Sequence, residues 1–187
     1  MKKYNKIQDA LLGIAVGDAL GVPFEFNTTD QMKKNPAKDM IGYGTNNQAP
    51  GTWSDDSSMM LCLLESLTKK YDVEDIGQTF VKWYQHGYWG AHHTLFDIGN
   101  TTRDSLDRII KGTSTDLSGN FFEESNGNGS LMRTLPLAFF LKDETDIEEL
   151  YKKVKEVSSI THAHFRSNFS CFIYIIFAIE LLKKKTI

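Results

Sequence analysis

The sequence of 187 residues has only two cysteines and lacks an excess of positive charge. Cys62 and Cys171 lie far apart on apolar stretches, so they match neither a disulfide framework nor the spacing of a zinc site. We expect two buried thiols and a cytoplasmic protein. With 21 basic and 24 acidic residues and a formal charge of -3, the chain lacks the basic surface that a phosphate backbone attracts. Nucleic acid is therefore not expected as a partner.

The sequence also lacks an uninterrupted apolar run long enough to cross a bilayer. Near the N-terminus, Asp9 and Asp18 interrupt what would be the apolar part of a secretory signal, which predicts a helix of the mature protein. The most apolar run, residues 169–182, is followed by lysines and contains Glu180. It is shorter than the roughly 20 residues that a spanning helix needs. We expect no membrane, and we expect this run to form a core helix.

Helical periodicity dominates what the sequence does contain. Apolar residues such as Ile7, Leu11 and Ile14 recur at the spacing of one helix face, and no segment alternates as a strand does. Helices are expected near the N-terminus and at residues 59–67, 73–84, 102–111, 131–141, 147–158 and 164–184. With 41% hydrophobic residues, the pattern predicts one all-α domain over residues 1–187. The long polar connections at residues 27–53 and 112–130 are the expected functional loops.

The first helix combines small residues with an acid on its apolar side. Gly13, Gly17 and Gly21 lie four residues apart, which predicts close packing of another helix on that face. Asp18 lies on the apolar stripe, where an unpaired carboxylate costs on the order of several kcal/mol. We expect it to have a partner or a charged ligand. Glu25 follows between two phenylalanines in GVPFEF, which suggests a carboxylate in a pocket, although an exposed loop glutamate is more common.

The stretch GTWSDDSSMM, residues 51–60, has two interpretations. Ser54 suits a helix N-cap, with Asp55 and Asp56 in the first turn, where the helix dipole stabilises acids. The same carboxylates beside a hydroxyl are also the hard oxygen ligands that Mg²⁺ and Mn²⁺ prefer. By themselves, these residues favour the cap over the metal site.

Three further segments carry polar or glycine-rich patterns. The glycines of GNGSLMR allow backbone N–H groups to converge on an anion such as a diphosphate, although a simple turn explains them equally well. DIGNTTR presents Asp97 and Asn100 on a loop before a helix and by itself is no more than a capping sequence. In THAHFR, His162 and His164 lack further His or Cys residues at zinc-ligand spacing. A polar or stacking contact with a ligand is expected for His162.

Taken in order, GDALGVPFEF, GTWSDDSSMM, GNTTR, GNGSLMR and THAH resemble the motifs of the ADP-ribosylglycohydrolase family, typified by the dinitrogenase reductase-activating glycohydrolase. The resemblance extends across nearly the whole chain. It implies an all-α, orthogonal helical fold with a binuclear centre of Mg²⁺ or Mn²⁺. It also implies an enzyme that removes ADP-ribose from modified protein side chains, or from related acceptors, by hydrolysing a glycosidic bond.

The resemblance assigns roles to individual residues. Glu25 matches the family's acidic residue near the metals, and Glu25, Asp55 and Asp56 form the expected catalytic set. Ser54, Asp55 and Asp56 match a Thr-Asp-Asp metal triplet, in which serine keeps the hydroxyl. The residues expected to bind ADP-ribose are Asp97, Asn100, Gly127, Asn128, Gly129, Ser130, Met132 and His162.

One motif of the family has no counterpart in this sequence. Members carry a late Asp-x-Asp-Thr motif that supplies the remaining metal ligands, and here Glu180 is the only acid after Arg166. The resemblance is therefore expected to cover roughly two-thirds of a complete domain, without its C-terminal third. The helix at Phe169 to Leu182 then lacks its usual packing partners, and we expect a second copy or a partner protein to cover it.

Three functions follow from these expectations. The first is a Mg²⁺- or Mn²⁺-dependent hydrolase that acts on ADP-ribosylated proteins. The second is a catalytically impaired protein that still binds ADP-ribose through GNGSLMR and His162. The third is an inactive fragment that is stable only with a partner.

Overall fold

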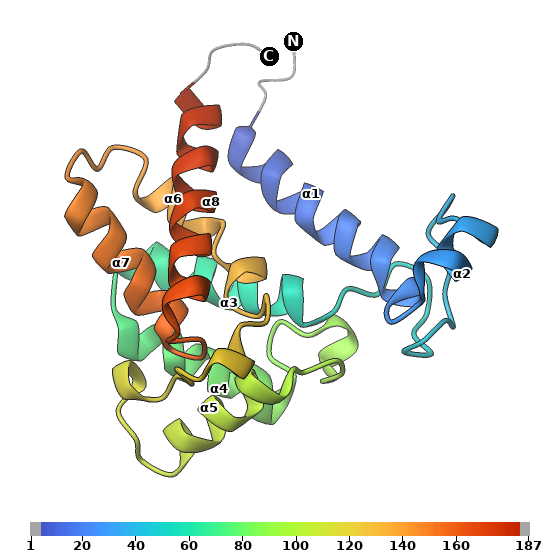
Figure 1. The fold of residues 1–187 in the computed structure, drawn as a ribbon, viewed down its shortest axis with the longest axis horizontal. Coiled ribbons are helices and arrows are strands. Elements are labelled where there is room, and N and C mark those ends of the chain that lie inside the picture. Colours follow the sequence, from blue (N-terminus) through green and yellow to red (C-terminus); the bar gives the residue numbers. More distant parts are fainter. Residues whose placement is uncertain (1–4, 184–187) are drawn as a thin grey trace.

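The computed structural model describes residues 5–183, and in that range it is built from helices, with a single isolated bridge between Asn120 and His162 (Figure 1). The predicted all-α fold class is confirmed. The α-helices are α1 Lys6–Gly21, α2 Thr29–Lys34, α3 Asp55–Lys69, α4 Val73–His86, α5 Asn100–Ile110, α6 Pro136–Phe140, α7 Ile147–Ser159 and α8 Phe165–Lys183. Short 3-10 turns are η1 Val22–Phe24, η2 Ala91–His93, η3 Thr115–Leu117, η4 Glu123–Ser125 and η5 Leu131–Arg133.

The hydrophobic core surrounds α3. Met59, Cys62 and Leu63 of this helix are fully buried and belong to one apolar cluster that includes residues of α4, α5, α7 and α8. Full burial of such a side chain stabilises the fold by about 1.5–3 kcal/mol. Cys171 of α8 lies in the same cluster, and both cysteines are free and buried, as predicted. The core therefore fixes the position of α3, whose N-terminus faces the candidate site.

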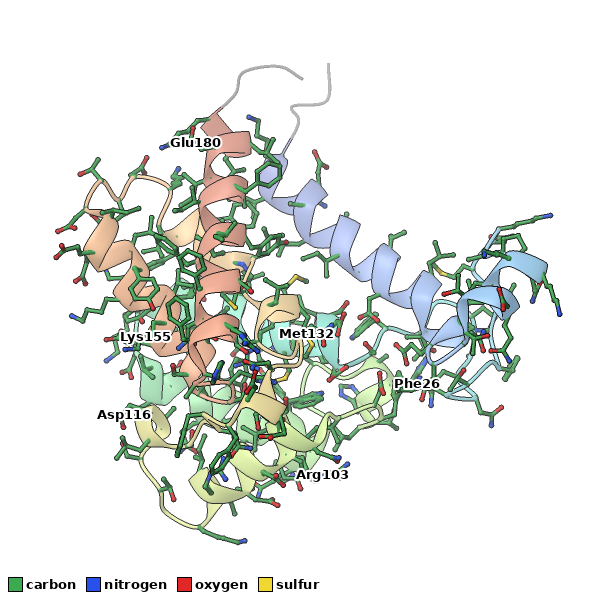
Figure 2. The ribbon with its side chains drawn as sticks, in the orientation of Figure 1. Phe26, Arg103, Asp116, Met132, Lys155 and Glu180 are labelled. Atoms are coloured by element: carbon green, nitrogen blue, oxygen red, sulfur yellow. The ribbon has the colours of Figure 1, made fainter. Side chains whose placement is uncertain are left out.

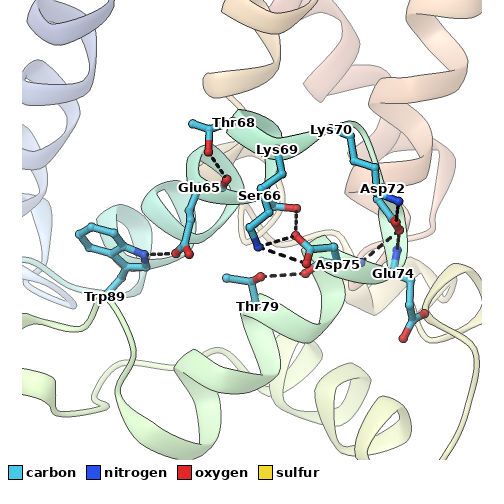
Figure 3. Close-up of polar contacts among 10 residues, drawn as sticks. All are labelled: Glu65, Ser66, Thr68, Lys69, Lys70, Asp72, Glu74, Asp75, Thr79 and Trp89. Carbon is cyan, nitrogen blue, oxygen red and sulfur yellow. Dashed lines mark hydrogen bonds and ion pairs between the residues drawn. The ribbon is translucent and has the colours of Figure 1, made fainter.

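Polar contacts fix the corner between α3 and α4 (Figure 3). Asp72 caps α4 by accepting hydrogen bonds from the N–H groups of Glu74 at 3.1 Å and Asp75 at 3.2 Å. The Ser66 hydroxyl of α3 donates to the Asp75 carboxylate at 2.5 Å, and the Lys69 ammonium lies 3.3 Å from the same group. These bonds satisfy the start of α4 and tie it to the end of α3.

Two expected elements differ from the structure. The helix expected at residues 131–141 is divided into η5 and α6, because Pro136 cannot continue a helix but suits the first position of a new one. The polar connection at residues 27–53 contains α2, which the helical periodicity did not reveal. Thr28 and Gln31 form a capping box at its start, and none of its residues is buried. Figure 1 shows α2 at the side of the molecule away from α7.

The first helix forms as predicted, but the expected close packing on its glycine face is wrong for the described part of the chain. No atom lies within 4 Å of the place where a Cβ would stand on Gly13, Gly17 or Gly21. Leu12 is 54% exposed and Val16 is 55% exposed. Ala19 is the buried residue of α1. One side of α1 is therefore open.

The apolar helix near the C-terminus is α8, and the structure covers one of its sides. Cys171, Ile175 and Ile179 are buried in the core, whereas Ile173 and Phe177 are more than half exposed. In residues 5–183, two helical stretches are long and apolar enough to cross a membrane, Lys6–Phe24 and Phe165–Lys183. Length and composition alone do not separate a core helix from a spanning helix. Within these residues, the expectation that this helix lacks packing partners on part of its surface is confirmed.

Candidate active site

The site begins where α1 meets the N-terminus of α3. The Asp18 carboxylate accepts hydrogen bonds from the backbone N–H groups of Ser54 and Ser57 at 3.0 Å and from the Ser57 hydroxyl at 2.6 Å. The first N–H groups of a helix lack partners within the helix, and they attract negative charge. Asp18 therefore has the partner that its place on an apolar stripe predicted, and α1 is anchored to α3.

Ser54 is the N-cap of α3. Its hydroxyl accepts a hydrogen bond from the N–H of Asp56 at 3.3 Å, and its carbonyl accepts one from the Ser58 hydroxyl at 2.7 Å. Ser54 is 3% exposed. The cap interpretation of GTWSDDSSMM is confirmed, and Asp55 and Asp56 occupy the first turn of the helix.

A cavity of about 510 Å³ opens beside this turn. It joins the segment after η1, the start of α3, the loop and first turn of α5, and the glycine-rich loop before η5. Phe26 and Met132, labelled in Figure 2, belong to two of these segments. The lining residues are Glu25, Phe26, Asp55, Asp56, Asp97, Ile98, Gly99, Asn100, Thr101, Thr102, Gly127, Asn128, Gly129, Met132 and His162.

Burial and mutual repulsion raise the pKa values of three carboxyl groups in the cavity. Burial, followed by repulsion from Asp56, raises the pKa of Asp55 to about 8. Burial also raises the pKa of Asp56 to about 6, with added repulsion from Asp18 and Asp97. For Glu25, burial and a hydrogen bond with Asp97 raise the pKa to about 7. Near neutral pH Asp55 therefore retains its proton and Glu25 is partly protonated, whereas Asp56 is mostly ionised. A bound cation would displace the retained protons.

The segment after η1 folds back to hold Glu25. The Asn46 side-chain amide donates a hydrogen bond to the Glu25 carboxylate, and the Thr45 hydroxyl donates to the Glu25 carbonyl at 2.6 Å. Gly44 makes this return possible, because a Cβ there would stand 1.9 Å from the Pro23 carbonyl oxygen. The polar connection at residues 27–53 thus positions an acid of the cavity.

The glycine-rich loop is held from behind by Arg133. Its guanidinium is fully buried, donates to the Gly129 carbonyl at 2.7 Å and to the Val157 carbonyl at 3.3 Å, and lies 4.6 Å from the centre of the Phe80 ring. Burial lowers its pKa to about 10. Its Nε has no hydrogen-bond partner among the described residues. A buried cation thus lies just behind the loop whose backbone was expected to bind an anion.

His162 packs against the same loop. A Cβ on Gly129 would stand 2.7 Å from the His162 ring, so this close approach requires glycine. The Nδ1 atom lies 2.8 Å from the Thr161 hydroxyl. Burial and the charge of Arg133 lower the pKa of His162 to about 3, so the ring is neutral at physiological pH. A neutral ring in the wall suits a polar contact with a ligand.

Comparison with known proteins places this site in a family. A family profile described as ADP-ribosylglycohydrolase matches residues 1–186. The chain belongs to the ADP-ribosylglycohydrolase family. It is similar to the ADP-ribosylarginine hydrolase Tri1 of Serratia proteamaculans, with 35% identity over 89% of this chain and 44% of that protein. It is also similar to the ADP-ribosyl-[dinitrogen reductase] glycohydrolase of Rhodospirillum rubrum, with 34% identity over 90% of this chain and 55% of that protein.

A solved structure supports the same assignment. A chain of an "ADP-ribosylglycohydrolase-related protein complex" superposes with a TM-score of 0.78 at 28% identity, over 95% of this chain and 56% of that chain. The chain therefore spans about half the length of the relatives it matches. The expectation that the chain matches only part of a complete family member is confirmed.

The fold brings together most of the residues that sequence reasoning assigned to a glycohydrolase site. All of them except Ser54 and Ser130 line the cavity. The Ser54 hydroxyl is used in the cap, and the Ser130 hydroxyl is buried 3.4 Å from the Cys171 sulfur, beside a second cavity of about 260 Å³. Asn100, expected on a loop, is the first residue of α5.

Sequence reasoning missed several residues that line this cavity. Phe26, Ile98, Gly99, Thr101 and Thr102 line it and are neighbours in sequence of predicted residues. No sequence pattern at these residues indicated that they line the cavity. The backbone gives one further signal: Phe26 has φ 61 and Asp97 has φ 55, a strained conformation for residues other than glycine.

The cavity contains side chains whose chemistry suits a divalent cation, but they do not enclose one. Asp55, Asp56, Glu25 and Asp97 offer the hard oxygens that Mg²⁺ and Mn²⁺ prefer, and the cavity wall contains no lysine or arginine among the described residues. Within residues 5–183, however, no group of three or more His, Cys, Asp and Glu side chains is placed to hold a metal ion. The described residues therefore do not form a complete metal site.

Proposed function

We propose that the cavity binds the ADP-ribosyl group of a modified protein and that the carboxyl groups on one side of it take part in hydrolysing the glycosidic bond. The observation that supports this is that acidic side chains and a glycine-rich loop line the same cavity. Glu25, Asp55 and Asp56 line it together with the loop Gly127–Gly129. Acids suit the cationic transition state of glycosidic cleavage, and a glycine-rich loop before a helical turn suits the diphosphate.

In this proposal the acids have separate roles. Asp55 and Asp56 would hold Mg²⁺ or Mn²⁺, with further ligands from outside residues 5–183, and the cation would supply Lewis-acid stabilisation of developing negative charge. Glu25 exchanges a proton near neutral pH, since its pKa is about 7, and this suits a general acid or base. Asn46 keeps the Glu25 carboxylate oriented by its hydrogen bond.

The other wall of the cavity would hold the rest of the ligand. Backbone N–H groups of Gly127, Asn128 and Gly129 would bind the diphosphate, and the buried charge of Arg133 adds favourable potential behind them. His162, neutral and buried, would make a polar or stacking contact, and Asp97 and Asn100 would accept hydrogen bonds from ribose hydroxyls.

We further propose an ADP-ribosylated arginine side chain as the substrate class. This rests on similarity to the Serratia protein, whose name describes an ADP-ribosylarginine hydrolase. The test is release of ADP-ribose from an ADP-ribosylated arginine peptide in Mg²⁺ or Mn²⁺, with wild type compared with Asp55→Ala/Asp56→Ala. The proposal expects a loss of at least 100-fold in the double variant. Equal rates in both proteins, or no release by either, would refute it.

A second function, ADP-ribose binding without hydrolysis, is favoured by two observations. The chain spans about half of its relatives, and the described carboxylates do not form a complete metal cage. Titration calorimetry with free ADP-ribose separates the two functions, because saturable binding without any release from the peptide supports this one. The matched control is Gly129→Leu, which fills the space against His162 and should abolish binding in either case.

A further inference from the structure

We propose that Phe26 determines specificity for the acceptor side chain, by packing the face of its ring against the cationic guanidinium of an ADP-ribosylated arginine at the acidic end of the cavity. The inference rests on the function proposed above and deepens it, because it assigns recognition of the amino acid that carries the ADP-ribosyl group to one residue. The roles given above to Glu25, Asp55 and Asp56 do not include that recognition.

Phe26 occupies a turn position at which phenylalanine is unusual. The Asn27 N–H donates to the Phe24 carbonyl at 3.1 Å, so residues 24–27 form a four-residue turn. Glu25 has φ -52 and ψ 145, and Phe26 has φ 61, as the two central residues of a type II turn do. Such a turn favours glycine or asparagine at its third residue, because φ is positive there. The needs of the turn therefore do not account for phenylalanine.

The side chain of Phe26 faces solvent and lines the cavity. It is 82% exposed, the largest exposed fraction among the large hydrophobic side chains of the described residues, and it belongs to the cavity wall. Contacts on both sides hold this segment: the Thr45 hydroxyl donates to the Glu25 carbonyl at 2.6 Å, and Thr28 forms part of the capping box that begins α2. A strained residue that the core does not bury, fixed at the edge of a cavity, is available to a ligand.

The chemistry of the bond to be cleaved places the acceptor beside Phe26. In ADP-ribosylated arginine this bond joins the anomeric carbon of the terminal ribose to a guanidinium nitrogen, whereas the diphosphate is attached at the exocyclic carbon. With the diphosphate on the loop Gly127–Gly129 and the scissile bond at the acids, the acceptor lies on the side of the acids away from that loop. Phe26 is adjacent in sequence to Glu25. Figure 2 shows it towards α2, and shows Met132, which follows the glycine-rich loop, towards α8.

The charge of the cavity wall favours a cation at this place. Carboxyl groups line the wall, and no lysine or arginine does so among the described residues. A guanidinium keeps its positive charge at neutral pH, and the negative face of an aromatic ring attracts it at distances up to about 6 Å from the ring centre. A serine that carries ADP-ribose offers no cation to the ring. Phe26 therefore distinguishes an arginine acceptor from a neutral one.

Two other roles for an exposed ring predict different measurements. A ring that stacks on the adenine base would contribute equally to the binding of free ADP-ribose, since that ligand contains the same base. A ring that packs against the peptide around the acceptor would contribute equally to arginine and serine peptides. Contact with the guanidinium predicts a contribution that is confined to the arginine-linked ligand.

The test measures dissociation constants at pH 7 by titration calorimetry for three ligands: free ADP-ribose, and one peptide that carries ADP-ribose on an arginine or on a serine. A chelator is present, so that the metal-dependent cleavage proposed above does not consume the peptides. Phe26→Leu keeps an apolar side chain without an aromatic face. It should weaken binding of the arginine-linked ligand about three- to fivefold, the size of an exposed cation–π contact, and leave the other two ligands unchanged. Phe26→Trp should retain the preference.

Matched glycine variants separate recognition from folding. Phe26→Gly removes the ring and suits the positive φ, so it should lose the preference for arginine while unfolding at the same or a higher urea concentration than wild type. Tyr43→Gly is the control, because Tyr43 also has φ 61, is 69% exposed and is not among the residues that line the cavity. It should bind all three ligands like wild type.

The titrations distinguish failure of this inference from failure of the proposed function. If Phe26→Leu weakens free ADP-ribose as much as the arginine peptide, weakens both peptides equally, or weakens no ligand, the assignment of Phe26 is overturned and ADP-ribose binding stands. A loss of preference in Tyr43→Gly as large as that in Phe26→Gly would overturn it as well. Wild type that binds none of the three ligands would refute the proposed function, and this inference with it.

Discussion

At the scale of single residues, the cavity gathers acids without a basic partner in its wall. Asp55 and Asp56 are adjacent in sequence and share the first turn of α3, so they cannot move apart. Glu25 and Asp97 approach them from other segments, and burial adds to the repulsion. The nearest buried cation, Arg133, lies behind the glycine-rich loop and is bonded to two backbone carbonyls. The repulsion among these buried carboxyl groups, and the buried charge of Arg133, lead to two predictions.

The first prediction concerns Asp55 and pH in metal-free protein. Its pKa rises from 3.8 to about 8 on folding, so the folded state binds this proton more tightly than the unfolded state. The resulting stability is fully present below pH 4 and is lost as pH rises towards 8. Asp55→Asn should remove that loss, which amounts to at most ~1.4 kcal/mol per pH unit.

Urea denaturation from pH 5 to 8 with a chelator measures this difference. Asp143→Asn is the control, because that side chain is 89% exposed. Identical pH profiles for wild type and Asp55→Asn would contradict the prediction.

The second prediction concerns Arg133. Arg133→Met removes the charge and leaves the Gly129 and Val157 carbonyls without their donor, which should cost about 1–3 kcal/mol of unfolding free energy. It should also raise the pKa of His162, because the charge of Arg133 now lowers it. NMR titration of the ring measures that pKa and separates this electrostatic effect from simple destabilisation. Arg166→Met, at an exposed arginine, should leave both quantities unchanged.

At the scale of elements, one helix caps another. Asp18 of α1 satisfies the first N–H groups of α3 and thereby fixes the angle between the helices at the edge of the cavity. The same helix has one buried residue and an open glycine face, so this contact is its main polar attachment. α1 is therefore anchored by Asp18 near its C-terminal end and by Lys6 at its other end, and Ala10 and Ile14 pack against the core, while the glycine side stays open.

Asp18→Ala should lower the free energy of unfolding by about 1–2 kcal/mol, the usual cost of losing a helix cap. It should also increase amide hydrogen exchange at Ser54 and Ser57. The comparison is Asp9→Ala, at an exposed acid of the same helix, which should change stability by less than half as much. If both variants lost the same free energy of unfolding, the hydrogen bonds from Asp18 to α3 would add nothing beyond the effect of removing one negative charge from α1.

At the scale of the whole molecule, the apolar surface is divided unevenly. α3 and its neighbours enclose a full core, whereas α1 and α8 present long apolar sides to solvent. The cytoplasmic location and the binuclear Mg²⁺ or Mn²⁺ centre stay predictions.

The sequence by itself determined the local features. Periodicity located most helices, and Ser54 signalled the start of α3, because a helix cap depends on residues that are neighbours in sequence. Asp18 signalled a partner, because an unpaired carboxylate on an apolar helix face is costly wherever it occurs. The five ordered motifs also signalled the family and ten of the fifteen residues that line the cavity. α2 and the break before Pro136 were missed, because a short exposed helix has no apolar face to detect and a proline was read as part of a longer apolar run.

Only the tertiary structure decided which distant residues meet. It placed Asn46 on Glu25, put Arg133 behind Gly129, and left the glycine face of α1 open. It also turned Ser130 towards Cys171 and away from the cavity in which it was expected. Such contacts join residues far apart in the chain, and their free energy depends on how whole helices pack. No local pattern encodes that packing, so it appears only when the chain is folded.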